Sequence, residues 1–287
     1  MNMNTQKLKK IYLLPNVITA FGLSCGLFVI FKMNMIGLGE VTPQLLLIVT
    51  GILLLSAFAD VLDGAVARAI KAESEFGNVF DSLADAISFG VAPSVIVLKT
   101  LSLDPGTQLS FLITTASMVF SICGVLRLVR FNVSSLAAKA SEELSIAHKK
   151  HFTGLPIPAA AAAAISINLF LFSPDFQSVA SLSLMAKTWI LSITLLFLGY
   201  CMVSRWKFPS IKTLEIRVSS FQTVFLTVLA AVFIFFGILH YFALVFLILT
   251  WAYIALALSL SIARLIAGRK SKTLEDFEPE PEDEIED

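Results

Sequence analysis

Residues 58–85 read FADVLDGAVARAIKAESEFGNVFDSLAD, which places four aspartates inside an otherwise apolar part of the chain. Residues 44–59 before the first aspartate and residues 86–98 after the last one contain no charged side chain. An ionised carboxylate at membrane depth costs about 2.5–3.5 kcal/mol, so four of them together require a compensating partner. The stretch therefore predicts a polar centre between two membrane helices.

The composition of the whole chain agrees with a membrane protein. Of 287 residues, 57% are hydrophobic and 15% are charged, and the mean hydropathy is +0.85. These values exclude a disordered chain and argue against an ordinary soluble enzyme. We therefore predict an all-α, polytopic membrane helix bundle of about eight transmembrane helices. The expected spans are 13–31, 44–69, 78–98, 109–128, 155–172, 186–204, 220–239 and 242–263.

The distribution of Lys and Arg predicts the orientation of these spans. With the N-terminus in the cytoplasm, 18 of the 21 basic residues fall on the cytoplasmic side. Only Lys32, Lys99 and Lys187 fall outside. This positive-inside bias predicts that both termini are cytoplasmic.

The ends of the chain differ from the apolar part between them. Residues 274–287 hold nine of the 21 acidic residues and no Lys or Arg, so the rest of the chain carries a net charge of +9. We expect a cytoplasmic N-terminal segment at 1–12, a membrane domain at 13–270 and a disordered acidic cytoplasmic tail at 271–287. Cys25, Cys123 and Cys201 all lie in apolar runs, which predicts core packing instead of disulfides or a zinc site.

The spacing of the four aspartates predicts that their carboxylates converge. Asp60 and Asp63 are three residues apart, and Asp81 and Asp85 are four apart, so each pair shares a helix face. The short link at 71–76 returns the chain antiparallel, which brings both pairs toward one membrane surface. Arg68 cannot neutralise four acids, which argues against a salt-bridge cluster. Oxygen ligands favour Mg²⁺ or Mn²⁺, and such sites usually include substrate phosphates.

These residues also carry the pattern Asp-x2-Asp-Gly-x2-Ala-Arg-x8-Gly-x3-Asp-x3-Asp, which resembles the signature of the CDP-alcohol phosphotransferases. Further segments at 14–19, 22–26, 127–132, 152–161 and 203–210 are similar to the bacterial CDP-diacylglycerol–serine O-phosphatidyltransferase branch. The acidic tail lies outside the resemblance. The eight signature positions are Asp60, Asp63, Gly64, Ala67, Arg68, Gly77, Asp81 and Asp85.

The resemblance implies a role for each matching position. Asp60, Asp63 and Asp81 would bind the divalent metal, while Asp85 would act as general base and also approach the metal. Ser74 is a weaker candidate for a nucleotide contact, and a plain loop serine is the alternative. Asn16 and Thr19 are candidates to face the nucleotide. The alternative role for both is helix capping and packing. The residues expected to border the CDP group are Gly64, Ala67, Arg68 and Gly77.

The resemblance also implies the substrates CDP-diacylglycerol and L-serine, with phosphatidylserine and CMP as products. Arg127 and Arg130, near Asn132, are the candidates for binding the serine carboxylate, and Arg205 and Lys207 come second. Anchoring to anionic lipid is the alternative role for these cations. Glycerol 3-phosphate, choline or inositol phosphate remain alternative acceptors. We expect a homodimer in the bacterial inner (cytoplasmic) membrane, an active site at the cytoplasmic face and no nucleic acid partner.

Two other classes of protein place acids in membrane helices. A membrane prenyltransferase also uses aspartates with magnesium and a diphosphate, but its two acidic motifs usually lie far apart in the chain. An ion-coupled transporter would carry its acids near mid-membrane on broken helices. The clustering of all four aspartates within 26 residues favours the transferase over both.

Overall fold

Apolar runs separated by short polar connections form the helices of this protein. The computed structural model describes residues 3–70, 74–140, 152–204, 207–208, 237 and 240–267. A pair of two-residue antiparallel strands, β1 and β2, is the only strand pairing in these ranges. In chain order the elements are α1 (Met3–Asn34), α2 (Pro43–Ala69), α3 (Glu75–Asp85), η1 (Ala86–Val91), α4 (Ala92–Leu101), α5 (Gln108–Ala140), β1 (Phe152–Thr153), α7 (Ile157–Leu171), α8 (Pro174–Val179), α9 (Leu184–Val203), β2 (Lys207–Phe208) and α11 (Phe242–Ala267).

Hydroxyl side chains cap the N-termini of several helices. The Thr42 side chain accepts a hydrogen bond from the Leu45 backbone N–H at 3.2 Å, and Pro43 occupies the first turn of α2. At the start of α3, Ser74 accepts from the Gly77 N–H at 3.0 Å. These caps satisfy donors that have no partner inside the helix, which fixes where α2 and α3 begin.

The third span is one helix with a wider turn in its middle. α3, η1 and α4 run without a break from Glu75 to Leu101. η1 is a π-helical turn that ends two residues before Pro93, which has no backbone N–H. The Gly90 carbonyl within η1 accepts a hydrogen bond from Ser121 Oγ of α5 at 2.8 Å. A neighbouring helix therefore supports the irregular turn, which follows Asp85 immediately.

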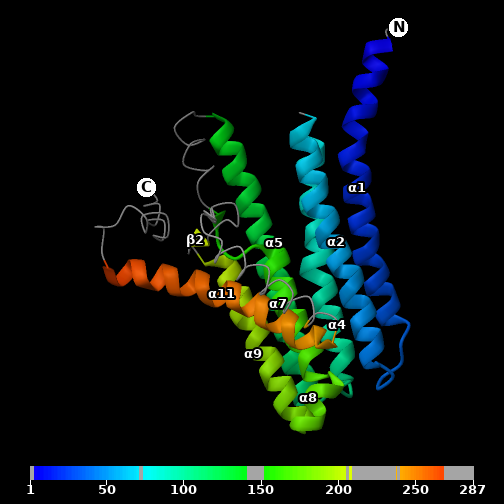
Figure 1. Cartoon of the computed structure of the whole chain (residues 1–287), viewed down its shortest axis with the longest axis vertical. Helices are drawn as coiled ribbons and strands as arrows, with labels where there is room; N and C mark the ends of the chain where they lie inside the picture. Colours follow the sequence, from blue (N-terminus) through cyan, green and yellow to red (C-terminus); the bar gives the residue numbers. More distant parts are fainter. Residues whose placement is uncertain are drawn as a thin grey trace, which may run out of the picture.

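The helices pack in two groups, which meet at α7 and where α5 packs against η1 and α4 (Figure 1). α1 lies against α2 and against the α3–η1–α4 span, while α5 packs along α9. α7 contacts α2, α4, α9 and α11, and its small residues Ala160, Ala161, Ala163 and Ala164 are each at most 2% exposed. Such small side chains allow close helix approach, so α7 joins the two groups.

Six helices in the described residues are long and apolar enough to cross a membrane. They correspond to six of the eight expected spans. The expected span 155–172 is the shorter α7, and its 15 residues are about 22 Å long, less than the roughly 30 Å hydrocarbon core. The expected span 220–239, apart from residue 237, and the tail 271–287 lie outside the described residues.

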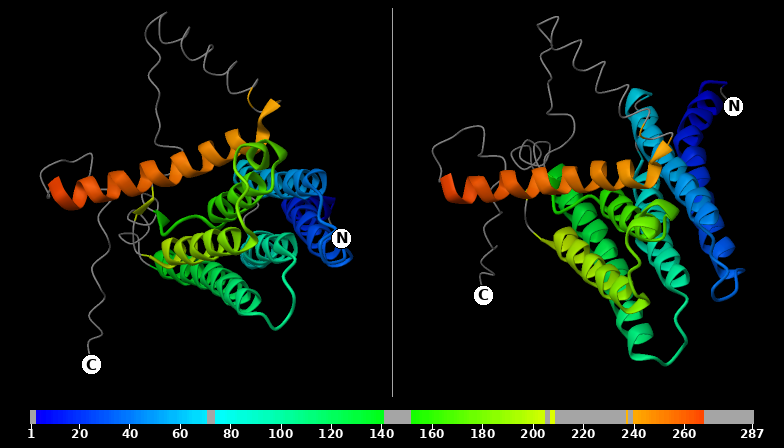
Figure 2. Two further views of the ribbon diagram at one scale, coloured as in Figure 1. Left: turned by 90° about the horizontal axis from the view of Figure 1, so that it is seen from below. Right: turned by 60° about the horizontal axis from the view of Figure 1, so that its bottom comes forward.

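α11 differs from the other candidate spans in direction. It runs across the long axis of the bundle in Figure 1, and both views in Figure 2 agree. Its central part packs on α7, where Trp251 Nε1 donates a hydrogen bond to the Ala163 carbonyl at 3.3 Å. Its length and composition thus match a span, while its direction departs from a simple parallel bundle.

Large apolar side chains cover the outer surface of the helices. Phe111 is 76% exposed and Phe58 is 64% exposed, among many others. An exposed apolar surface of this extent is typical of a protein surrounded by lipid. The three cysteines are free, and Cys25 and Cys201 are buried, as predicted for core residues.

Candidate active site

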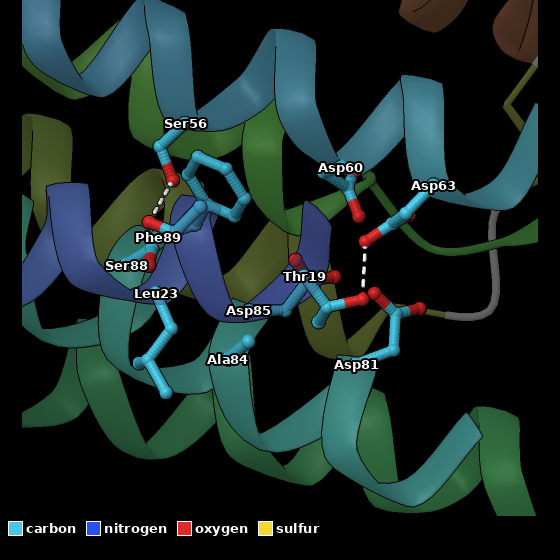
Figure 3. Close-up of a pocket in the computed structure, with 11 residues that line it drawn as sticks. Thr19, Leu23, Ser56, Asp60, Asp63, Asp81, Ala84, Asp85, Ser88 and Phe89 are labelled. Carbon is cyan, nitrogen blue, oxygen red and sulfur yellow. Dashed lines mark hydrogen bonds between the residues drawn. The ribbon is translucent and has the colours of Figure 1, made fainter. Parts of the chain in front are cut away.

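The two aspartate pairs face each other between α2 and α3 (Figure 3). One carboxylate oxygen from each of Asp60, Asp63 and Asp81 lies within 4.8 Å of the others. The Asp60 carboxyl also comes within hydrogen-bonding reach of the carboxyls of Asp81 and Asp85. The structure therefore brings together the four side chains whose convergence the spacing predicts.

Helix α1 closes the third side of this cluster. Thr19 Oγ1 donates a hydrogen bond to Asp63 Oδ2 at 2.5 Å, and Thr19 itself is 6% exposed. One turn further along α1, the Gly22 carbonyl accepts a hydrogen bond from Ser56 Oγ of α2 at 2.8 Å. Both bonds cross from α1 to α2, so they fix the helix that carries Asp60 and Asp63.

The donor set fits a hard divalent cation. Three carboxylate oxygens lie within 4.8 Å of one another, and the described residues place no histidine or cysteine in this cluster. Four carboxylates this close repel one another, and a cation removes that repulsion. Oxygen-only ligands are those that Mg²⁺ and Mn²⁺ prefer. Asp60, Asp63 and Asp81 would hold such an ion.

A cavity of about 360 Å³ opens beside the aspartates. Gly77 lies close to α1: a Cβ added at this position would come 3.2 Å from Asn16 Oδ1. Ser74 caps α3 and also lines the cavity, and its contact with a nucleotide stays a prediction. Asn78 is a lining residue that sequence reasoning missed, although it directly follows the signature glycine. The lining residues are Pro15, Asn16, Thr19, Asp63, Gly64, Ala67, Ser74, Gly77, Asn78 and Asp81.

Arg68 lies at the edge of this cavity and is not one of its lining residues. Its side chain is exposed, and its guanidinium runs back over Gly64, where an added Cβ would be 3.5 Å from Nη1. It still attracts the Asp63 carboxylate electrostatically. Arg68 could therefore approach an anionic ligand in this cavity from the solvent-exposed side.

A second cavity of about 190 Å³ lies on the other side of the same carboxylates (Figure 3). Thr19, Asp63 and Asp81 line both cavities and form the boundary between them. Ser56 and Ser88 also line the second cavity, although no sequence motif marks either residue. The full lining is Thr19, Gly22, Leu23, Ser56, Asp60, Asp63, Asp81, Ala84, Asp85, Ser88 and Phe89.

The two expected cations of α5 have different surroundings. Arg127 interacts electrostatically with Asp85 and with Tyr253 of α11, and its buried Nε has no hydrogen-bond partner among the described residues. Arg130 donates from Nη1 to the Val203 carbonyl at 2.9 Å, which ties α5 to the end of α9. Arg127 is thus within electrostatic range of Asp85, whereas Arg130 holds a backbone carbonyl.

Asn132, Arg205 and Lys207 are the other residues expected near the serine carboxylate. Asn132 Nδ2 donates to Ser82 Oγ at 2.9 Å and so links α5 to α3 beside the aspartates. Arg205 lies outside the described residues. Lys207 is in β2, beside the end of α9.

The sequence matches the family model of the CDP-alcohol phosphatidyltransferases over residues 12–200, a range that includes both aspartate pairs. This chain therefore belongs to the CDP-alcohol phosphatidyltransferase family and is a membrane transferase. The match confirms the resemblance carried by the signature positions.

The chain is also similar to individual members of this family. The CDP-diacylglycerol–serine O-phosphatidyltransferase of Helicobacter pylori (strain 26695) is 32% identical over 251 residues, which cover 85% of this chain and 93% of the relative. The Bacillus subtilis protein of that name is 30% identical over 199 residues, 69% of this chain and 91% of the relative. An archaetidylserine synthase from Methanothermobacter thermautotrophicus is 31% identical over 161 residues, 55% and 58% of the two chains.

Proposed function

We propose that this chain transfers the phosphatidyl group of CDP-diacylglycerol to L-serine and releases CMP, with Mg²⁺ or Mn²⁺ as cofactor. The observation that carries this proposal is the convergence of Asp60, Asp63, Asp81 and Asp85. All four line the second cavity, and Asp63 and Asp81 also line the larger one. The names of relatives that share most of their length with this chain support serine as the acceptor.

The cavities around the carboxylates suit a substrate that is polar at one end and apolar at the other. The larger cavity offers the side chains of Asn16, Ser74 and Asn78 to a nucleotide. Phe89 lines the second cavity and also an apolar cavity of about 260 Å³ between α2, α7 and α11. Within the part of the chain that the structure describes, no charged residue lines that apolar cavity. A nucleotide joined through a diphosphate to a lipid matches this sequence of environments.

The proposed transfer is a substitution at phosphorus. The serine hydroxyl oxygen attacks the phosphorus that bears the diacylglycerol, the bond from this phosphorus to the bridging oxygen breaks, and CMP leaves with that oxygen. Asp85 accepts the proton of the attacking hydroxyl. A divalent cation held by Asp60, Asp63 and Asp81 would neutralise the diphosphate and stabilise the leaving CMP. Thr19 fixes the orientation of Asp63 throughout, through its hydrogen bond.

Arg127 is the proposed ligand of the serine carboxylate. It attracts Asp85 electrostatically, and its Nε has no hydrogen-bond partner among the described residues. A planar guanidinium binds a carboxylate through two parallel hydrogen bonds. A serine bound there would present its hydroxyl close to Asp85. Arg130, three residues further along the same helix, is the second candidate cation.

We also propose the setting of the reaction. The catalytic domain spans residues 13–270 in the bacterial cytoplasmic membrane, its active site faces the cytoplasm and the protein acts as a homodimer. Six apolar helices in the described residues and the bacterial relatives support the membrane assignment. The excess of basic residues on one side of the expected spans supports the orientation.

The test is a CMP-release assay on the purified full chain in micelles of detergent and CDP-diacylglycerol. Serine, glycerol 3-phosphate, choline and inositol phosphate are offered separately with Mn²⁺ or Mg²⁺, and the lipid product is identified by mass spectrometry. We expect phosphatidylserine with serine alone. Asp85→Asn should lower kcat by at least about 100-fold, because a general base typically contributes that much.

Asp175→Asn is the matched control, because this exposed aspartate lies in the first turn of α8, outside both cavities. It should retain wild-type turnover. Turnover with a different acceptor would keep the transferase and overturn the serine assignment. An absence of CMP with every acceptor, from protein that melts cooperatively, would overturn the proposed function.

A further inference from the structure

Asn132 of α5 is hydrogen-bonded to α3, the helix that carries Asp81 and Asp85. Its Nδ2 donates to Ser82 Oγ at 2.9 Å, and this hydroxyl donates to the Asn78 carbonyl at 3.0 Å. Ser82 directly follows Asp81, and Asn78 lines the larger cavity. The bond from α5 therefore ends on the part of α3 that borders the candidate active site.

Asn132 lies between two exposed apolar residues. Phe131 is 44% exposed and Val133 is 61% exposed, whereas Asn132 is half-buried and its amide is bonded to Ser82. An amide at the end of an apolar span is costly unless it is hydrogen-bonded, and a bond to a neighbouring helix satisfies it. The Asn132–Ser82 bond is thus a specific contact between α5 and α3.

This bond crosses the boundary between the two groups of helices. α3 packs against α1, whereas α5 packs along α9, where Arg130 Nη1 donates to the Val203 carbonyl at 2.9 Å. The four aspartates lie on α2 and α3, in the first group. Arg127 and Arg130, the two candidate ligands of the serine carboxylate, lie on α5, in the second group. Different groups of helices therefore carry the two sides of the proposed reaction.

A second hydrogen bond joins the same two groups further along the span. Ser121 Oγ of α5 donates to the Gly90 carbonyl of η1 at 2.8 Å. On α5, Arg127 falls between Ser121 and Asn132. On the facing span, Asp85 falls between the partners of these two residues, and it interacts electrostatically with Arg127. Loss of the Asn132 bond would leave this stretch of the interface bonded at one end only.

We propose that Asn132 is a positioning residue of the acceptor site, whose bond to Ser82 holds the cations of α5 at a fixed distance from Asp85. The acceptor hydroxyl must lie within hydrogen-bond reach of its base, and a displacement of about 1 Å can cost about 100-fold in rate. Without the bond, α5 would stay with α9 through Arg130 and lose its register against α3. The inference rests on the proposed function, because it takes Asp85 as the base and a cation of α5 as the ligand of serine.

The test measures phosphatidylserine formation by the full chain in micelles, with serine and CDP-diacylglycerol titrated separately. Asn132→Ala and Ser82→Ala should each lower kcat/KM for serine at least about tenfold. KM for CDP-diacylglycerol should stay within about twofold, and the melting temperature within a few degrees, because one interhelical hydrogen bond adds little stability. The double variant should match either single one, since both changes remove the same bond. A packing role alone would affect both substrates and lower the melting temperature together.

Thr100→Val is the matched control, because it removes another amide–hydroxyl bond from the same span. Asn168 Nδ2 of α7 donates to Thr100 Oγ1 at 3.1 Å, and Thr100 lies roughly 22 Å along the span from Asp85. This variant should keep kcat/KM for serine within about twofold of wild type. Wild-type kcat/KM for serine in Asn132→Ala, or additive losses in the double variant, would overturn the inference and leave the proposed function standing. A wild-type chain that forms no phosphatidylserine would overturn the proposed function, and the inference with it.

Discussion

Thr19 of α1 donates a 2.5 Å hydrogen bond to Asp63 of α2, across 44 residues of sequence. Both side chains are buried, at 6% and 4% exposed, so the carboxylate has little water to compete with this donor. The bond uses one acceptor position of the Asp63 carboxylate, and a carboxylate has further lone pairs that can bind a ligand. Thr19 is therefore part of the site even though it lies outside the aspartate signature.

Replacing Thr19 by valine should weaken the site without emptying space in the core, because valine has nearly the same shape. A hydrogen bond to a charged group contributes about 1.5–3 kcal/mol, so kcat/KM measured by CMP release at limiting Mn²⁺ should fall about 10–100-fold. Thr19→Ser keeps the hydroxyl and should retain most activity. Thr188→Val, which removes a buried hydroxyl bonded to the Leu184 carbonyl at 2.9 Å, is the control. Equal activity of Thr19→Val and wild type would contradict the role of the bond.

Replacement by alanine should affect substrate binding at Gly64 and stability at Gly154. An added Cβ at Gly64 meets only the Arg68 guanidinium, at 3.5 Å, so Gly64→Ala should melt like wild type. Because Gly64 lines the larger cavity, the methyl group should raise KM for CDP-diacylglycerol several-fold. Gly154 has φ +79° and its Cβ would collide with the Met202 carbonyl, so Gly154→Ala should lose more than about 1 kcal/mol of stability. Thermal melts and substrate titrations of both variants separate the two effects.

The sequence predicted most of the helices, because their apolar runs are bounded by clear polar signals. The largest differences concern how far helices extend and how they are directed. α5 continues to Ala140, well past the expected end at residue 128, since nothing between 129 and 140 stops a helix. The direction of α11 across the bundle depends on its packing against α7, which no local pattern encodes.

The candidate site was predictable where the residues are close in sequence. The pairs Asp60–Asp63 and Asp81–Asp85 have helical spacing, so their convergence followed from a short link. Cavity-lining residues such as Ser88 were not predictable, because their place at the cavity depends on the π-helical turn and on the approach of α1 at Gly26. Both features arise from tertiary packing.

Neutralising one aspartate should separate stability from activity. In EDTA the four carboxylates repel one another, and Asp81→Asn removes one of the charges at the centre of the cluster. This variant should therefore melt at the same temperature as wild type or a few degrees higher in EDTA. Added Mn²⁺ should raise the melting temperature of wild type only, and CMP release should be abolished in the variant. A variant that melts well below wild type in EDTA would show that the cluster is already stable without a cation.

Arg127 and Arg130 should differ when each is changed to lysine, which keeps the charge and removes the planar fork. If Arg127 binds the serine carboxylate beside Asp85, Arg127→Lys should raise KM for serine at least about tenfold and leave KM for CDP-diacylglycerol within about twofold. Arg130→Lys loses the 2.9 Å bond to the Val203 carbonyl, so it should lower the melting temperature by a few degrees and raise KM for serine less. Serine and CDP-diacylglycerol titrations, each at saturation of the other substrate, give both constants. A larger serine effect at Arg130 than at Arg127 would transfer the carboxylate site to Arg130, because the two residues share a helix and differ mainly in which of them faces the aspartates.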